Sequence, residues 1–91
     1  MIGKYCIIRG VNSGVHAGTV AEHIGTEVLL HDSRRLWYWV ANGGVALSGL
    51  SQLGLKEGKI DVNVPNLRVL DACEIIECSD LAAMSISNYG A

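Results

Sequence analysis

Residues 27–40 read Glu-Val-Leu-Leu-His-Asp-Ser-Arg-Arg-Leu-Trp-Tyr-Trp-Val, and this stretch decides the fold class. Residues 27–31 and 34–40 are rich in aliphatic and aromatic side chains, which favour extended backbone. Between them, His31-Asp32-Ser33 is typical of a turn, because Asp and Ser side chains can bond their own backbone there. The stretch therefore predicts two antiparallel strands joined by a tight turn.

The flanking sequence extends this β pattern in both directions. Gly18 lies inside one expected strand and predicts a bend or bulge, as small barrels use at their corners. Pro65 is expected to stop another strand, and residues 55–59 are expected to form a loop. The further strands that we expect are residues 4–9, 15–23, 60–64 and 69–78.

We expect two short helical segments, one inserted between strands and one after the last strand. Residues 45–53 carry Ala46, Leu50 and Leu53 at helical spacing, which predicts one inserted helix. Ser79-Asp80 is typical of a helix cap and predicts a helical turn over residues 81–86. Residues from Ser87 onward are expected to fray.

The expected architecture is a mainly β fold: a small, bent antiparallel barrel of the SH3-like or Sm-like kind, with one inserted helix and a C-terminal helical turn. The chain has 91 residues, 49% hydrophobic and 18% charged, and shows no linker. This composition predicts a single packed domain over residues 1–91.

The net charge, the apolar runs and the cysteines disfavour several classes of protein. Net charge is −2, which disfavours non-specific nucleic-acid binding, and no apolar run is long enough to span a membrane. No signal peptide is visible at the N-terminus, so a cytoplasmic protein is expected. The three cysteines, Cys6, Cys73 and Cys78, lack the spacing of a disulfide framework and are expected to be free thiols.

The run Arg34-Arg35-Leu36-Trp37-Tyr38-Trp39 resembles a family of short bacteriophage and prophage proteins that is known only as a domain of unknown function. Similar segments occur in that family at residues 14–20, 27–30, 47–53 and 74–76, so the resemblance covers nearly the whole chain. The sequence departs from the family at residues 40–46, where members carry a shorter turn. The resemblance implies a phage origin and implies no particular activity.

The same run supplies the strongest candidate binding residues: Arg34, Arg35, Trp37, Tyr38 and Trp39. Strand alternation places Arg35, Trp37 and Trp39 on one outer face, with Leu36 and Val40 turned inward. Guanidinium groups bind phosphate in a bidentate manner, and indole rings stack on bases. The alternative is that both tryptophans cover the core or bury a subunit interface, since Trp, Tyr and Arg are also enriched at interfaces.

Some of the remaining polar residues are further candidates for the binding site, and the others are not assigned to a site. Ser48, Ser51 and Gln52 could add hydrogen bonds to a small ligand; the alternative, which we favour, is that they cap and solvate the helix. His16 could donate to an anionic ligand. The spacing of His16, His23 and His31 matches no familiar metal site, so neither a metal nor a cofactor is expected. No nucleophile elbow or phosphate loop is present, so we expect no catalysis.

These observations predict a non-enzymatic phage accessory protein that sequesters a small nucleotide-derived molecule in the cytoplasm of the infected bacterial host. A domain of this size rarely encloses a deep pocket alone, so binding sites between the subunits of a homo-oligomer are expected. One alternative is an interaction module that docks on a host protein and inhibits it. A further alternative is RNA binding in the manner of Sm-like rings, against which the negative net charge counts.

Overall fold

The computed structural model describes residues 1–90 and contains six strands and two helices. None of the helices in residues 1–90 reaches the length and apolarity needed to cross a membrane. The elements in chain order are β1 (Tyr5–Gly10), β2 (Val15–Ile24), β3 (Glu27–Ala41), α1 (Leu47–Leu53), β4 (Leu55–Ile60), β5 (Val64–Val69), β6 (Ala72–Glu77) and α2 (Asp80–Ser87).

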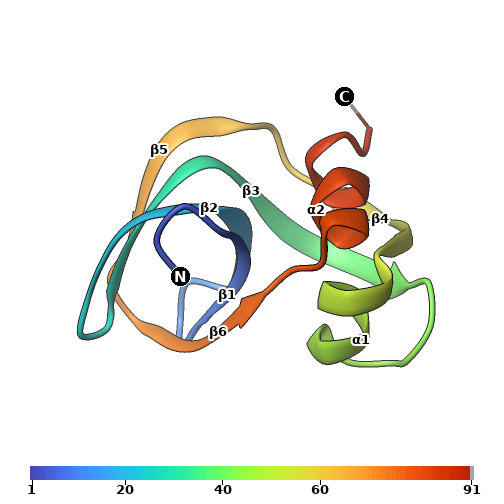
Figure 1. Cartoon of the computed structure of the whole chain (residues 1–91), viewed down its shortest axis with the longest axis horizontal. Helices are drawn as coiled ribbons and strands as arrows, with labels where there is room; N and C mark the ends of the chain where they lie inside the picture. Colours follow the sequence, from blue (N-terminus) through green and yellow to red (C-terminus); the bar gives the residue numbers. More distant parts are fainter. Residues whose placement is uncertain (91) are drawn as a thin grey trace.

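All six strands belong to one curled antiparallel sheet. Its order is β4-β3-β2-β1-β6, and β5 pairs with β3 beside β4. Figure 1 shows β1, β2, β3, β5 and β6 arranged around an open ring, with α1 and α2 beside β4 and the far end of β3. The expected mainly β fold, with a bent antiparallel sheet, an inserted helix and a C-terminal helix, is confirmed.

The long strand β3 joins the two parts of the molecule. One edge of β3 pairs with β5 from Val28 to Ser33 and with β4 from Leu36 to Ala41. The turn expected at residues 31–33 is wrong, because Asp32 adopts a φ of 53° and bends β3 without ending it. Aspartate is one of the few non-glycine residues that tolerate this left-handed conformation.

The bulge expected at Gly18 is confirmed. The pairing of β2 with β3 shifts between Ala17 and Thr19. A Cβ atom at Gly18 would lie 3.1 Å from the carbonyl oxygen of His31, a tight contact, so β3 would have to shift slightly to admit a side chain there. This bulge increases the curl of the sheet around the ring.

The strands after α1 differ from the sequence prediction. Residues 55–59, expected to be a loop, form most of β4, and residues 61–63, expected in a strand, connect β4 to β5. Pro65 lies inside β5 rather than stopping a strand. The regular pairing of β5 with β3 omits Pro65 and Asp32, at the position where Asp32 bends β3. The expected last strand, residues 69–78, is divided by a turn between β5 and β6.

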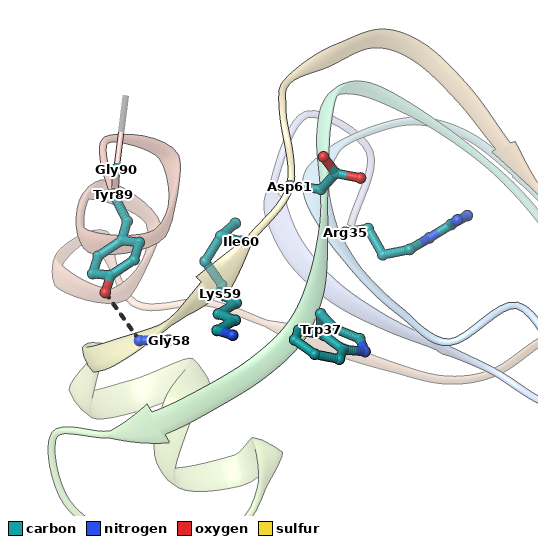
Figure 2. Close-up of a pocket in the computed structure, with 8 residues that line it drawn as sticks. All are labelled: Arg35, Trp37, Gly58, Lys59, Ile60, Asp61, Tyr89 and Gly90. Atoms are coloured by element: carbon teal, nitrogen blue, oxygen red, sulfur yellow. Dashed lines mark hydrogen bonds between the residues drawn. The ribbon is translucent and has the colours of Figure 1, made fainter.

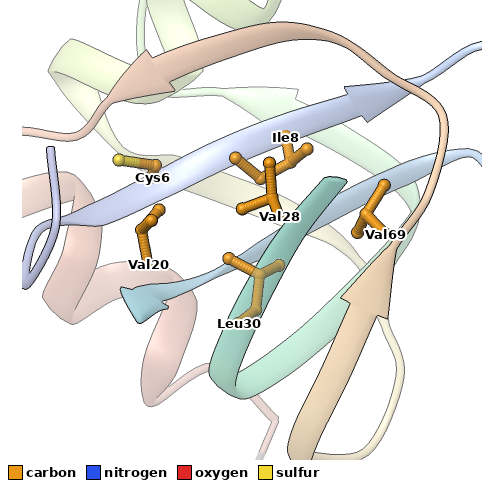
Figure 3. Close-up of a cluster of buried hydrophobic side chains, with 6 residues drawn as sticks. All are labelled: Cys6, Ile8, Val20, Val28, Leu30 and Val69. Carbon is orange, nitrogen blue, oxygen red and sulfur yellow. The ribbon is translucent and has the colours of Figure 1, made fainter. Parts of the chain in front are cut away.

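Two hydrophobic clusters lie on opposite faces of the sheet. The inner cluster fills the ring and comes from β1, β2, β3 and β5; Figure 3 shows its side chains pointing toward one another. The helix-side cluster packs the sheet against Leu50 of α1 and Ile86 of α2. The inner cluster comprises Cys6, Ile8, Val20, Val28, Leu30 and Val69, and the helix-side cluster comprises Ile7, Ala17, Leu36, Leu50 and Ile86.

Helix α2 is fixed at both ends. The predicted cap is confirmed, since the Ser79 side chain accepts a hydrogen bond from the Ala82 N–H. The fraying expected from Ser87 onward is wrong: the Tyr89 hydroxyl accepts a hydrogen bond from the Gly58 N–H at 3.0 Å. Ser85 Oγ likewise accepts from the Leu55 N–H at 3.0 Å. Helix α2 and the residues after it therefore cover the outer edge of β4.

Arg34 connects α2 to the segment between β4 and β5. Its side chain is only 6% exposed and forms no ion pair with any residue from 1 to 90. Its guanidinium instead donates to four backbone carbonyls, those of Ile60, Asp61, Ile86 and Tyr89. Ile86 lies in the last turn of α2 and Tyr89 follows the C-cap, so the guanidinium sits at the helix end where the dipole favours a positive charge.

We predict that Arg34→Met lowers the free energy of unfolding by at least about 2 kcal/mol, because buried carbonyls then lose charged donors. Urea denaturation followed by circular dichroism measures this loss. Arg35→Met is the matched control: the Arg35 side chain is exposed and makes no hydrogen bond or ion pair within residues 1–90. We expect the control to change stability by less than about 0.5 kcal/mol. Equal losses in the two variants would contradict the role given to Arg34.

Candidate ligand-binding site

A bulge at Trp37 separates the aromatic side chains of β3. Leu36 pairs with Ile60 and Tyr38 with Lys59, so Trp37 has no opposing residue in β4. Such an extra residue reverses the alternation of the side chains that follow it. Trp39 therefore turns inward with Leu36 and packs against the helix-side cluster.

The sequence prediction for this face is consequently corrected. Arg35 and Trp37 remain exposed, but Trp39 is half-buried and belongs to the core rather than to the outer face. Tyr38, which strict alternation places on the side of Leu36, is exposed instead. The expectation for Leu36 is confirmed, since its side chain is buried in the helix-side cluster.

A surface hollow of about 570 Å³ lies beside Trp37, and we call it the Trp37 hollow. Two of its residues come from β3, three from β4, one from the connection after β4, and two from the segment after α2 (Figure 2). This volume lies in the range of small-molecule sites. The lining residues are Arg35, Trp37, Gly58, Lys59, Ile60, Asp61, Tyr89 and Gly90.

The Trp37 hollow combines an exposed indole ring with two positive charges. The Trp37 side chain is 75% exposed, and the Lys59 Nζ lies 5.0 Å from the centre of its ring. Within residues 1–90, neither Lys59 nor Arg35 forms an ion pair. Asp61 supplies one negative charge, and its Oδ1 accepts a hydrogen bond from the Val62 N–H at 2.7 Å. The side chains therefore leave a small excess of positive charge.

Glycine and tyrosine shape one wall of this hollow. A Cβ atom at Gly58 would lie 2.4 Å from the carbonyl oxygen of Tyr38, so only glycine lets β4 approach β3 this closely. The Gly58 N–H in turn holds the Tyr89 hydroxyl (Figure 2). Arg34 lies outside this lining, but it binds the backbone of Ile60, Asp61 and Tyr89, and so it supports the hollow from behind.

The polar residues of α1 lie outside the lining of the Trp37 hollow. The Ser51 side chain is buried, and its Oγ donates to the carbonyl oxygen of Ser48 at 2.8 Å. Gln52 donates to Ser51 Oγ and to the carbonyl oxygen of Glu77, both at 3.1 Å. These bonds attach α1 to the end of β6. Ser51 and Gln52 thus make hydrogen bonds within the protein, whereas the Ser48 side chain is exposed and contributes only its backbone carbonyl.

His16 lies at a second hollow, of about 420 Å³, which we call the His16 hollow. Asp71 Oδ1 accepts from Ser13 Oγ at 2.7 Å, and Ser13 Oγ lies 3.2 Å from His16 Nε2. Because an ionised carboxylate only accepts, the Ser13 hydroxyl must donate to Asp71. His16 Nε2 must therefore carry the proton that it donates to Ser13, which leaves Nδ1 as an unprotonated acceptor.

Nitrogen Nδ1 of His16 has no hydrogen-bond partner, and the side chain is only 1% exposed. Burial lowers the pKa of His16 below its ordinary value, and the neighbouring positive charge of Arg35 lowers it further. The negative charge of Asp71 and the hydrogen bond that His16 donates to Ser13 act in the opposite direction and offset part of this shift. His16 is thus held as a neutral imidazole. Within residues 1–90, no group of three or more His, Cys, Asp or Glu side chains is placed to hold a metal ion.

A comparison with protein families identifies the chain. The model described as "Domain of unknown function (DUF6948)" matches residues 3–86. The chain belongs to the DUF6948 family. The match includes all six strands of this DUF6948 domain, but it ends before Tyr89 and Gly90 of the Trp37 hollow. Comparisons with curated proteins and with solved structures gave no significant match.

Sequence reasoning missed most of the DUF6948 residues that border Arg35 and Trp37. Lys59 and Asp61 were not recognised, because the pairing of β4 with β3 was not predicted. Tyr89 was assigned to a frayed end, and no local pattern distinguishes it from an ordinary exposed tyrosine. The alternation of Asp61, Val62 and Asn63 suggested a strand, whereas these residues form the connection beside the hollow.

We predict that the DUF6948 domain loses stability as pH falls from about 8 to about 5, partly through His16. The pKa of His16 is lower in the folded chain than in the unfolded chain, so the unfolded chain takes up more protons. The contribution of neutral His16 to stability is complete above the pKa of His16 in the unfolded chain. It is lost as the pH falls through that value toward the lower pKa of His16 in the folded chain. Melting temperatures across this range should fall less steeply for His16→Phe than for the wild type. The exposed His23→Phe serves as control and should keep the wild-type slope.

Proposed function

We propose that this protein binds a small anionic ligand that carries a flat ring, of the nucleotide class, in the Trp37 hollow. One observation carries the proposal: an exposed indole ring lies beside two basic side chains, Arg35 and Lys59, that form no ion pair within residues 1–90. An exposed ring of this size is costly in water and useful to a ligand that stacks on it.

Each group in the hollow has a complementary part in such a ligand. A base stacks on the Trp37 ring, a contact worth about 1–3 kcal/mol. The Arg35 guanidinium presents a planar pair of donors to a phosphate, and the Lys59 ammonium adds a compact second charge. The Asp61 carboxylate is an acceptor suited to a sugar hydroxyl.

The biological role that we propose is sequestration without catalysis. The resemblance of residues 34–39 to phage and prophage proteins supports an accessory protein that acts in the cytoplasm of an infected bacterium. There it would remove a nucleotide signal on which a host defence system depends. Such a role requires affinity and abundance, and it requires no reactive group in the hollow.

We further propose that the binding unit is a homo-oligomer. The Trp37 hollow lies at the surface, and exposed apolar side chains adjoin its lining: Tyr38 follows Trp37 in β3, and Val62, 71% exposed, follows Asp61 in the connection after β4. A second copy placed against them would deepen the hollow and remove apolar area from water.

A protein partner is the second candidate function, because Trp, Tyr and Arg are also the residues that dominate interface energetics. Titration with nucleotides distinguishes a small-molecule binding protein from a module that binds a protein partner. RNA binding in the Sm-like manner receives less support from a chain of net charge −2, and it would show a steep dependence of affinity on salt.

We expect at least one nucleotide from a panel of cyclic dinucleotides, cyclic trinucleotides and ADP-ribose derivatives to bind with a Kd below about 10 μM. Calorimetry on the wild type tests the panel. Arg35→Ala and Trp37→Ala should each weaken binding by about tenfold or more, a loss of about 1.4 kcal/mol. Trp37→Phe should retain part of the stacking. Arg9→Ala, which removes an exposed arginine outside the hollow, is the charge control and should bind normally. If no panel member binds, the nucleotide proposal is wrong and a protein partner becomes the better candidate.

Light scattering at micromolar concentration should give a mass above that of one 9.7 kDa chain. Val62→Lys should lower this mass, since a charge would replace an apolar side chain at the proposed contact. Val45→Lys is the matched control, because Val45 is 99% exposed and lies before α1, outside the hollow. A monomer mass for the wild type would contradict the proposed assembly while leaving ligand binding by a single chain open to calorimetry.

A further inference from the structure

The His16 hollow has a different chemistry from the Trp37 hollow, and the two share no lining residue. Its apolar wall comes from the end of β5 and the residue after it, and its polar rim comes from the loop between β1 and β2 and from Asp71. Its volume of about 420 Å³ is sufficient for a small organic molecule. The lining residues are Asn12, Ser13, His16, Leu67, Arg68, Val69, Leu70 and Asp71.

The charged groups of the His16 hollow are already paired within the protein. Asp71 Oδ2 accepts from the Asn12 and Ser13 N–H groups at 2.7 and 3.0 Å, so these loop amides are not available to an anionic ligand. Arg68 Nη1 lies 3.9 Å from Glu22 and 3.8 Å from Glu27. A charged ligand would have to break these internal contacts, whereas a neutral ligand would leave them intact.

His16 supplies the unmet hydrogen bond of this hollow. Among the lining side chains, only His16 contains a buried nitrogen or oxygen atom that lacks a partner within residues 1–90, and that atom is Nδ1. Leaving a buried acceptor unpaired costs about 1–3 kcal/mol. The Nε2 bond to Ser13 fixes the tautomer, so Nδ1 can accept a proton donor but cannot donate.

The geometry points to a second binding site here, for a neutral molecule with an apolar ring and one O–H or N–H donor, of the phenol or indole class. The ring packs against Leu67, Val69 and Leu70, and the donor bonds to His16 Nδ1. The imidazole belongs to the lining of the hollow, and its Nδ1 has no partner within residues 1–90. The site is independent of nucleotide binding in the Trp37 hollow.

Phenol and toluene form a matched pair of probes, because they have nearly the same shape and differ in the donor. Both are titrated into the ¹⁵N-labelled full chain, with backbone and imidazole resonances recorded by nuclear magnetic resonance. We expect phenol to shift the signals of residues 12–16 and 67–71, to move the Nδ1 resonance of His16, and to bind at least about fivefold more tightly than toluene, about 1 kcal/mol.

The preference for phenol should disappear in His16→Phe, which keeps the ring and removes the acceptor. Toluene binding should persist in that variant. If His16→Phe does not fold, the comparison of phenol with toluene on the wild type still tests the proposal. Equal affinities of the wild type for phenol and toluene, a stationary Nδ1 resonance, or the absence of shifts around the His16 hollow would each overturn the proposal.

Discussion

The burial of Arg34 is the interaction on which the arrangement of the domain depends. A guanidinium group inside a protein is stable only when its donors are bonded, and in residues 1–90 backbone carbonyls take the place of a carboxylate. These carbonyls come from two segments that are more than 20 positions apart in the sequence. By holding both, Arg34 sets the position of Ile86 in the helix-side cluster and of Tyr89 at the Trp37 hollow.

The bulge at Trp37 also determines where side chains lie, but it acts only on the neighbouring residues of β3. Without the bulge, Trp37 and Trp39 would lie on the same face of β3. Both side chains would then point either into the core or into solvent. With it, Trp39 completes the helix-side cluster while Trp37 stays in solvent next to Lys59. Gly58 permits the close strand approach that this pairing needs. Local strand geometry thus separates two similar side chains into a packing role and an exposed one.

The sequence predicted the parts of the fold that local pattern determines. The extended segments before α1, apart from the continuation of β3 through Asp32, the bulge at Gly18 and the Ser79 cap follow from local pattern, which acts over a few residues. The pairing of β4 and β5 with one edge of β3 could not be predicted in this way, because it depends on partners distant in the sequence. For the same reason, Arg35 and Trp37 were identified in the candidate site, while Lys59 and Tyr89 were missed. Arg34 was predicted as a ligand contact, whereas its guanidinium is buried and bonds backbone carbonyls, including one in α2, which lies far along the chain.

The outer edges of the sheet next to β3 are poor templates for another strand. On β4, the N–H groups of Leu55 and Gly58 are bonded to the side chains of Ser85 and Tyr89. On β5, Pro65 has no N–H to offer. A free strand from another chain would therefore find two donors of β4 already bonded and one donor of β5 missing. These features disfavour, along these two edges, the strand-to-strand addition that leads to amyloid-like aggregation.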